Sequence, residues 1–188
     1  MIGLVILLLI AMPALAQCKE PRDKKTVTET TKFCGQNYLL PNGMRIGANE
    51  IILDCGNALI QGEFKEKTGM TIENKQNVII RNCIFMNYET GISLLNSTNI
   101  TITNTGLLRN NNGIKLVNSH NNTIIENRDV SLKKTILETD SKDNLIHYEN
   151  KQINSDYCRY NYCNQVVRNY SLKAVLMEAI RVWITEQN

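Results

Sequence analysis

The sequence lacks the short motifs that usually identify a nucleotide or metal site. It contains no Gly-x-Gly-x-x-Gly or other phosphate-binding glycine loop, so nucleotide binding has no support. It contains no Cys-x-x-Cys, and neither His120 nor His147 has a cysteine or histidine at ligand spacing. The Gly-Gly-x-Gly-x-Asp calcium repeat of secreted toxins is also missing. We therefore expect no cofactor and no metal.

An excess of charge of one sign is missing as well. The 21 basic residues are nearly balanced by 18 acidic residues, which leaves a net charge of +3. Aromatic residues make up only 6% of the chain, and no basic patch with interleaved aromatics occurs. Nucleic acid and anionic membrane surfaces are therefore not expected partners.

Glycine, by contrast, recurs at a fixed spacing of 22 residues, at Gly47, Gly69, Gly91 and Gly113. The last three open near-copies of one phrase, as in Gly-Ile-Ser-Leu-Leu-Asn-Ser and Gly-Ile-Lys-Leu-Val-Asn-Ser. Gly47 shares the spacing more than the phrase, because its coil carries an extra excursion over residues 61–68. A period of this length indicates a solenoid, in which stacked repeats bury one continuous core.

A second series runs in step with the glycines. Short apolar phrases open at Asn77, Asn99, Asn122 and Asn144, which lie 22, 23 and 22 residues apart. Within these phrases apolar and polar residues alternate, as in a strand with one buried face. The turns between are rich in Asn, Ser, Gly and Thr. The sequence therefore predicts an all-β parallel β-helix of about four to five coils over residues 45–156.

Three stretches carry a family resemblance: residues 52–62, residues 77–84 and residues 91–127. Together they resemble the right-handed parallel β-helix repeat proteins of the pectin-lyase-like superfamily, including the domain named after the NosD periplasmic copper-binding protein. The resemblance implies the fold. It implies less about function, because this family includes polysaccharide lyases and hydrolases, adhesins and accessory proteins of metalloenzyme maturation.

The first 16 residues indicate export. Residues 2–15 are almost wholly apolar, and Ala14-Leu15-Ala16 is a small-x-small cleavage site. We expect a signal peptide over residues 1–16 and a secreted, periplasmic or cell-surface location. A membrane contact is expected only if this segment is retained. Residues 17–44 are interpreted as an N-terminal lead-in or cap, loose over its charged, Thr-rich part.

Six cysteines in an exported chain allow 15 disulfide pairings. Cys18 and Cys34 flank the lead-in, and Cys158 and Cys163 lie beyond the last coil, so we favour bridges 18–34 and 158–163 at the two ends. The other two cysteines, at positions 55 and 83, lie inside repeat phrases. For them a bridge and a reduced buried pair both stay open.

The C-terminal residues 157–188 are interpreted as a second cap. Ser171 is a plausible N-cap for a helix over about 171–186, whose apolar residues follow the i, i+3, i+4, i+7 rule. We favour a plug on the last coil over a membrane or partner helix, because the polar face carries only Lys173 and Arg181 as bases.

Catalytic residues are not evident. A glycosidase site needs two carboxylates a few ångströms apart, and the projected columns of the coils each hold only one. The motifs of polygalacturonases and pectate lyases are missing. Asn82, Asn104 and Asn127 recur at one repeat position and are interpreted as a structural amide ladder. The sequence therefore leans against an enzyme, although a polysaccharide lyase or hydrolase stays open.

Binding to a polysaccharide or a cell-surface protein is the favoured function. Candidate sugar-stacking rings are Tyr88, Tyr148, Tyr157, Tyr160 and Tyr162. A second alternative is a NosD-like accessory role in copper-enzyme maturation, although Met70 and Met86 are isolated and do not form the ligand cluster that Cu(I) prefers.

Acceptor triplets for N-glycosylation form a separate set of candidate sites. They occur at Asn96, Asn99, Asn121 and Asn169. In a chain this rich in Asn and Thr, several such triplets arise by chance. Whether any of them is glycosylated also depends on the host.

Overall fold

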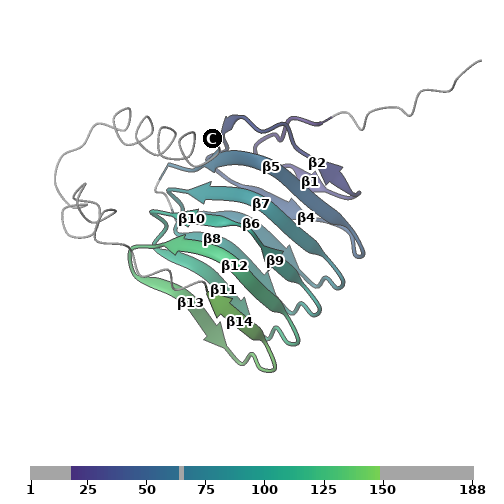
Figure 1. Ribbon diagram of the computed structural model, residues 1–188, viewed down its shortest axis with the longest axis vertical. Helices are drawn as coiled ribbons and strands as arrows, with labels where there is room; N and C mark the ends of the chain where they lie inside the picture. Colours follow the sequence, from purple (N-terminus) through teal and green to yellow (C-terminus); the bar gives the residue numbers. More distant parts are fainter. Residues whose placement is uncertain (1–17, 64–65, 149–188) are drawn as a thin grey trace, which may run out of the picture. The chain divides into compact units, whose positions relative to one another are not determined.

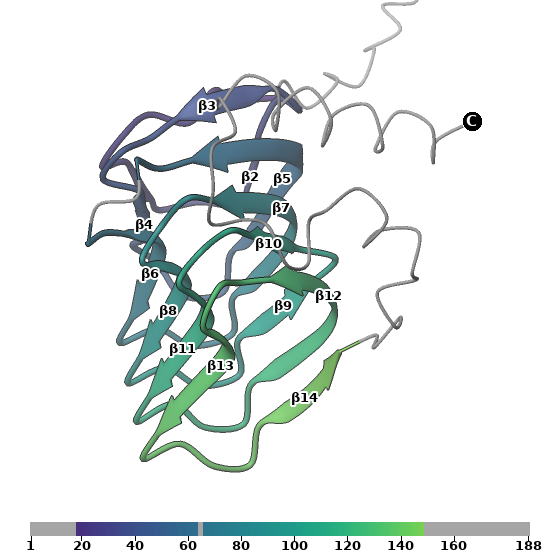
Figure 2. The same ribbon diagram turned by 90° about the vertical axis from the view of Figure 1, so that its left-hand side faces the viewer.

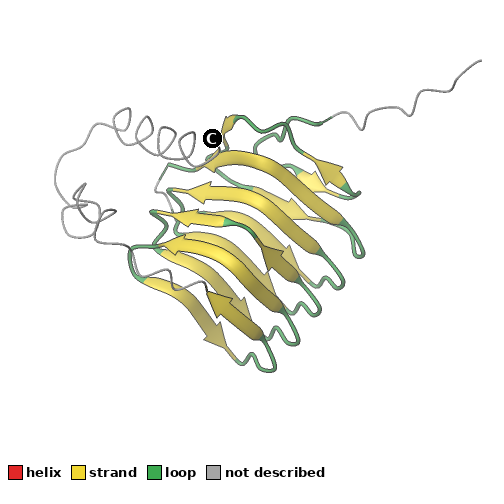
Figure 3. Ribbon diagram, viewed as in Figure 1, coloured by secondary structure: helices red, strands yellow, loops and turns green. Residues whose placement is uncertain are grey.

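A computed structural model describes residues 18–63 and 66–148 of the 188-residue chain. These residues form strands and turns, without a helix (Figure 3). The predicted signal peptide, C-terminal helix and 158–163 bridge lie outside the described residues. The strands are β1 (Thr26–Val27), β2 (Thr31–Lys32), β3 (Asn37–Leu39), β4 (Met44–Ile46), β5 (Ile52–Gln61), β6 (Thr68–Glu73), β7 (Ile79–Met86), β8 (Thr90–Leu95), β9 (Thr101–Thr103), β10 (Gly106–Leu108), β11 (Asn112–Val117), β12 (Thr123–Val130), β13 (Lys134–Thr139) and β14 (Leu145–Tyr148).

The strands stack as a solenoid of about five turns with a period of about 22 residues, so the predicted fold class is confirmed. Every pairing is parallel and joins one coil to the next (Figure 1). One sheet has the order β1-β4-β6-β8-β11-β13, and the other contains β2, β5, β7, β9, β10, β12 and β14 with β3 paired to β5 (Figure 2).

The second sheet bends, which gives the solenoid three faces. In β5 and β7 the pairing register shifts at the bend, between Asp54 and Ala58. The first face is the sheet that contains β4, β6 and β8. The second face consists of β2, β9, β14 and the N-terminal halves of β5, β7 and β12. The third face consists of β3, β10 and the C-terminal halves of β5, β7 and β12.

The corners between faces explain why the chain is rich in asparagine. Residues with a positive φ recur from coil to coil at two of the corners, a conformation that Asn tolerates better than most L-residues. The corner between the first and second faces carries two such columns. They are Asn74, Asn96, Asn118 and Asp140, with φ from 47° to 53°, and Glu50, Asn77, Asn99, Asn121 and Asp143, with φ from 52° to 59°. The corner between the second and third faces carries a third column, Asn57, Asn82, Asn104 and Glu126.

The periodic glycines have a different cause, because Gly69, Gly91 and Gly113 do not have a positive φ. Each lies against the large inward side chain of the opposite sheet. A Cβ at Gly69 would lie 2.8 Å from Phe85 Cδ1, and a Cβ at Gly91 would lie 2.7 Å from Leu107 Cδ2. Glycine therefore makes room for the core residue across the coil.

The fourth member of this column is Gly43 rather than Gly47. Met44 is in register with Met70, which places Gly43 beside Gly69, and a Cβ at Gly43 would collide with the carbonyl oxygens of residues 68 and 69. Gly47 therefore shares the 22-residue count without sharing the role, as its divergent phrase indicated.

The core is apolar through four coils and becomes polar in the last. Ile92, Leu94, Ile102 and Leu116 are fully buried. The structure confirms that Glu138 stands at the position of Leu94 and Leu116 in the preceding coils. In the same way Asp129 follows Leu107 on the opposite sheet. The last described coil therefore presents carboxylates where its predecessors present leucine.

The N-terminal segment is more ordered than predicted. The sequence predicts a lead-in or cap over residues 17–44 that is loose in its charged part, residues 19–32, but β1 pairs with β4, and β2 and β3 pair with β5. Val27, Phe33 and Leu40 are buried in the core cluster. The first coil therefore begins near residue 26 instead of residue 45. The charged residues that suggested a loose segment occupy the outward positions of short strands, in which inward and outward residues alternate.

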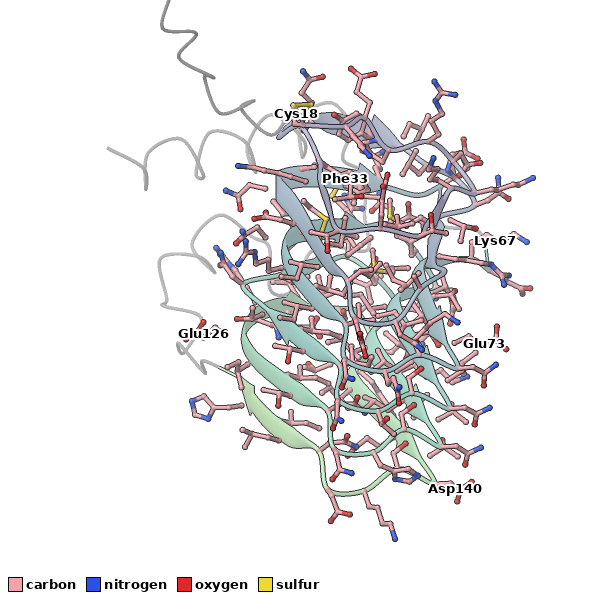
Figure 4. The ribbon with its side chains drawn as sticks, turned by 90° about the vertical axis from the view of Figure 1, so that its right-hand side faces the viewer. Cys18, Phe33, Lys67, Glu73, Glu126 and Asp140 are labelled. Carbon is pink, nitrogen blue, oxygen red and sulfur yellow. A yellow bond between two sulfur atoms is a disulfide. The ribbon has the colours of Figure 1, made fainter. Side chains whose placement is uncertain are left out.

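Two disulfides join neighbouring coils. The predicted Cys18–Cys34 bridge is present, and Cys55 and Cys83, for which the sequence left the alternatives open, also form a bridge. Figure 4 shows Cys18 of the first pair at the N-terminal end of the stack.

Candidate functional site

A row of outward, half-buried to exposed polar side chains follows the corner between the second and third faces. We call it the polar ladder, and it consists of Asp54, Arg81, Asn82, Thr103, Asn104 and Glu126. Its first rung centres on Asp54. Arg81 Nε donates to Asp54 Oδ2 at 3.0 Å, and Asn82 Nδ2 donates to Asp54 Oδ1 at 3.0 Å. The Gly56 N–H donates to the same Oδ1 at 2.9 Å. These contacts hold the carboxylate in a fixed position.

The ladder continues coil by coil. Asn104 Nδ2 donates to Asn82 Oδ1 at 2.6 Å, and Thr103 Oγ1 donates to Glu126 Oε2 at 3.1 Å. Glu126 lies on the side of the solenoid opposite Lys67 and Glu73 (Figure 4). The ladder therefore offers hydrogen-bonding groups at a regular spacing of about 4.8 Å along the stack.

A hollow of about 550 Å³ adjoins the first rung. Asp54 and Asn82 line it together with Lys32 and the 18–34 disulfide. Its remaining lining residues are Phe33, Gly35, Gly56 and Asn57. Because Lys32 and Asn57 are exposed, the hollow is open and mainly polar at its rim. It can accept a hydrated, hydroxyl-rich group better than an apolar one.

The electrostatics of the first rung favour an ionised carboxylate. Partial burial alone would raise the pKa of Asp54, but hydrogen bonds from Asn82 and the Gly56 N–H, together with the charge of Arg81, lower it below its usual value. Asp54 therefore acts as an anionic acceptor at neutral pH rather than as a proton donor.

The predicted asparagine ladder is half right. Asn82 and Asn104 stack as expected, but Asn127 does not join them. In the next coil Ile102 is in register with Ile124, which places Glu126 beside Asn104. Asn127 is buried instead, where its Oδ1 accepts from the Thr105 N–H at 3.0 Å. The spacing of 23 residues between Asn104 and Asn127 reflects this different role.

Sequence reasoning missed a recurring set of asparagine side chains that bridge neighbouring coils, buried except for the half-buried Asn144. The amide oxygen of each accepts a backbone N–H from the residue 22 positions earlier, and its Nδ2 donates to the carbonyl oxygen 25 positions earlier. The four are Asn110, Asn122, Asn127 and Asn144. Serine hydroxyls also join the coils: Ser119 Oγ accepts the Ser97 N–H, and Ser141 Oγ accepts the Ser119 N–H. The exact spacing of these residues in the sequence was the available signal.

The prediction that Tyr88 is an exposed sugar-stacking ring is wrong. Only 1% of its surface is exposed, its ring packs edge-on against Phe85, and its hydroxyl donates to the Leu40 carbonyl at 2.7 Å. Burial accordingly raises its pKa. Tyr88 lies in the turn between β7 and β8, and its side chain fills the corner of the core. The side chain of Tyr148, and Tyr157, Tyr160 and Tyr162, lie outside the described residues.

The glycosylation candidates share one end of the cross-section. Asn96, Asn99 and Asn121 are exposed corner residues, so their amides are accessible. Asn169 lies outside the described residues. Modification of these asparagines stays a prediction.

The described residues do not fit a copper site. Residues 18–63 and 66–148 contain no group of three His, Cys, Asp or Glu side chains that could hold a metal ion. The four cysteines in this part of the chain are all in disulfides. Met70 and Met44 are stacked inside the core, and His120 Nδ1 accepts the Lys142 N–H at 3.2 Å. The soft, clustered donors that Cu(I) prefers are therefore not assembled here.

The ladder is also poorly suited to glycoside hydrolysis. Asp54 and Glu126 are three coil steps apart, or about 14 Å. Paired catalytic carboxylates lie about 5 to 10 Å apart. Neither carboxylate of the ladder has the other as a partner.

The stacked parallel strands and their 22-residue period define a parallel β-helix protein. The chain belongs to the NosD family: the family model described as "Periplasmic copper-binding protein (NosD)" matches residues 20–173. Neither a curated protein nor a solved structure matches the chain. The periplasmic location of this family and the two disulfides are consistent with an extracytoplasmic location. Within the described residues, no helix has the length and apolar character needed to span a membrane.

Proposed function

We propose that the chain is an exported, non-catalytic protein of the cell envelope that binds a polysaccharide along the polar ladder. The observation that carries this proposal is the alignment of fixed, outward polar side chains over successive coils, half-buried at Asp54 and Asn82 and exposed at Asn104. Asn82 and Asn104 are held in one register, and the ionised Asp54 terminates the row beside an open polar hollow.

A repeating ligand suits a repeating surface. Each coil adds hydrogen-bond donors and acceptors at the same position around the cross-section. An extended polymer with hydroxyl groups therefore meets equivalent partners as it passes along the stack. Bridged carboxylate and amide groups are already oriented, which reduces the entropy lost on binding.

The test is binding of the exported form, residues 17–188, to a panel of envelope polysaccharides. Asn82 and Asn104 are both replaced by Gly, because glycine keeps the left-handed backbone while removing the amide. Asn118→Gly is the matched control, since Asn118 has the same backbone conformation on another corner. We expect the double variant to lose at least about tenfold in affinity, equivalent to one or two hydrogen bonds, and the control to bind normally.

The outcome also separates the alternatives. Reducing ends or unsaturated products released from the same samples would establish a hydrolase or lyase. Stoichiometric copper in the purified chain would favour the accessory role in copper-enzyme maturation. Equal binding by both variants would remove the polar ladder as the site.

A further inference from the structure

The hollow at the first rung of the polar ladder has a floor of backbone rather than of side chains. Gly35 and Gly56 meet there across neighbouring coils, and a Cβ at Gly35 would collide with the Gly56 carbonyl oxygen. A Cβ at Gly56 would lie 2.8 Å from the Phe33 carbonyl oxygen. Neither position has room for a side chain, which keeps the hollow of about 550 Å³ open. Cys18 and Phe33, which also line it, lie towards the N-terminal end of the stack (Figure 4).

Lys32 is the charged side chain that reaches over this floor. It is an exposed residue of β2, in register with Asp54 of the next coil. Its Cε lies 3.9 Å from the point that a Gly56 Cβ would occupy. Within residues 18–63 and 66–148 Lys32 makes no ion pair. Its ammonium group therefore lies at the hollow with donors that a ligand can use.

The carboxylate beside Lys32 does not cancel its charge, because Asp54 already has donors on both oxygens. Arg81 Nε donates to Oδ2, while Asn82 Nδ2 and the Gly56 N–H donate to Oδ1. Arg81 balances the negative charge of Asp54 through a direct ion pair of 3.0 Å. Two cations and one anion therefore leave the first rung with a net positive charge, which is located on Lys32.

A backbone donor lies at the same place. Gly35 is exposed, and its N–H donates to no acceptor in the part of the chain that the structure describes. Its nitrogen lies 3.7 Å from the point that a Gly56 Cβ would occupy, so it and the Lys32 ammonium group border the same open position. Anionic acceptors make shorter and stronger hydrogen bonds with such donors than neutral acceptors do. The hollow therefore suits an anionic group.

We propose that the polysaccharide bound along the polar ladder is acidic, and that one of its carboxylate or phosphate groups occupies the hollow and pairs with Lys32. This inference rests on the proposed function, because the rest of the polymer follows the amides of Asn82 and Asn104. Those amides bind hydroxyl groups, which nearly all polysaccharides carry. Lys32 is therefore the residue that selects an acidic polymer over a neutral one.

The test compares alginate, a polymer of uronic acid residues, with alginate whose carboxyl groups have been reduced to alcohols. We expect residues 17–188 to bind alginate more tightly at low ionic strength, and to lose this preference when salt screens the charges. Lys32→Gln removes the charge and should weaken alginate binding about two- to fivefold, the range of an exposed ion pair. It should leave binding of the reduced polymer unchanged, and Lys32→Arg should keep the preference for alginate.

Lys142→Gln is the matched control. Lys142 is an exposed lysine in the turn between β13 and β14, at the corner between the first and second faces, and its replacement removes the same charge. We expect Lys142→Gln to bind alginate as the wild type does. Phosphorylated dextran and plain dextran form a second pair of probes, which tells whether phosphate is accepted as well as carboxylate. A preference for the acidic member of either pair that depends on Lys32 supports the proposal.

Three results would overturn this inference and leave the proposed function standing. The first is equal binding of the acidic and neutral members in both pairs. The second is tighter binding of a deacetylated amino polysaccharide than of alginate, which would make Asp54 the recognising charge. The third is an equal loss of alginate binding in Lys32→Gln and Lys142→Gln, which would indicate attraction to the net charge of the protein alone. A failure of every polymer to bind would overturn the proposed function as well.

Discussion

Asp129 is a carboxylate at a position that the preceding coils fill with Phe85 and Leu107. Its Oδ1 accepts the Ser131 N–H at 2.7 Å, while its Oδ2 is buried against Gly113 with no hydrogen-bond partner in the described part of the chain. Burial raises its pKa to about 6, and hydrogen bonding from Ser131 offsets only part of that effect. Asp129 therefore destabilises the fold when it is ionised.

The raised pKa of Asp129 makes the free energy of unfolding depend on pH. Between pH 3.8 and about 6 the folded chain binds more protons than the unfolded chain, so the free energy of unfolding falls as the pH rises through this window. A pKa raised by about two units corresponds to about 3 kcal/mol of lost stability above pH 7.

Asp129→Asn removes the charge with little change in shape. We expect it to be more stable than the wild type by about 3 kcal/mol at pH 7.5, with the difference shrinking towards zero below pH 4. Urea unfolding across pH 3.5–8 measures it. Asp140→Asn is the control, because Asp140 is an exposed corner residue whose replacement should change stability by less than about 0.5 kcal/mol. A pH-independent difference between Asp129→Asn and the wild type would refute the reasoning.

Three further predictions concern the packing of the coils. Replacing Cys55 and Cys83 together by Ser should lower the free energy of unfolding by about 3 to 4 kcal/mol, because the bridge closes a loop of 28 residues, and urea unfolding with and without reductant checks this. Asn122→Ala leaves a buried N–H and a buried carbonyl without partners and should cost about 2 to 4 kcal/mol, whereas Asn118→Ala at an exposed corner should cost about 1 to 2 kcal/mol; equal losses in thermal unfolding would contradict the proposed bridge. Gly91→Ala places a methyl group 2.8 Å from a backbone oxygen and should destabilise by about 1 to 3 kcal/mol, so a neutral Tm would be inconsistent with the close approach.

Much of the fold could be predicted from the repeat alone. The register of Gly69, Gly91 and Gly113 and the decay at Glu138 follow from the 22-residue spacing, because in a solenoid one period of sequence corresponds to one coil along the stack. The Cys18–Cys34 bridge was predicted separately, from the position of both cysteines at the N-terminal end. The repeat did not predict where the first coil begins, since short strands such as β1 have too few residues to show a period.

The candidate site was harder to predict because it depends on single-residue register. An error of one residue in the register places Asn127 beside Asn104, where the structure has Glu126. It also assigns an outward position to Asn127, whose side chain points inward. The burial of Tyr88 was hard to predict for the same reason, since the side chain of a residue in the turn after a strand points either into the core or into solvent. Asp129 could be identified as a core position only after the bend in β12 had placed it opposite Gly113.

Because the corners repeat in every coil, the number of coils can change without changing the cross-section of the solenoid. Successive coils repeat the left-handed residues in the same three columns, so duplication of one 22-residue unit would insert a complete coil between existing ones. Such an insertion would lengthen the outer surface by about 4.8 Å while every other coil kept its neighbours' geometry. Deletion of one residue within a coil would turn the inward side chains of the following strand outward. We therefore expect this chain to evolve by gain or loss of whole coils, which changes the length of ligand that its outer surface can contact.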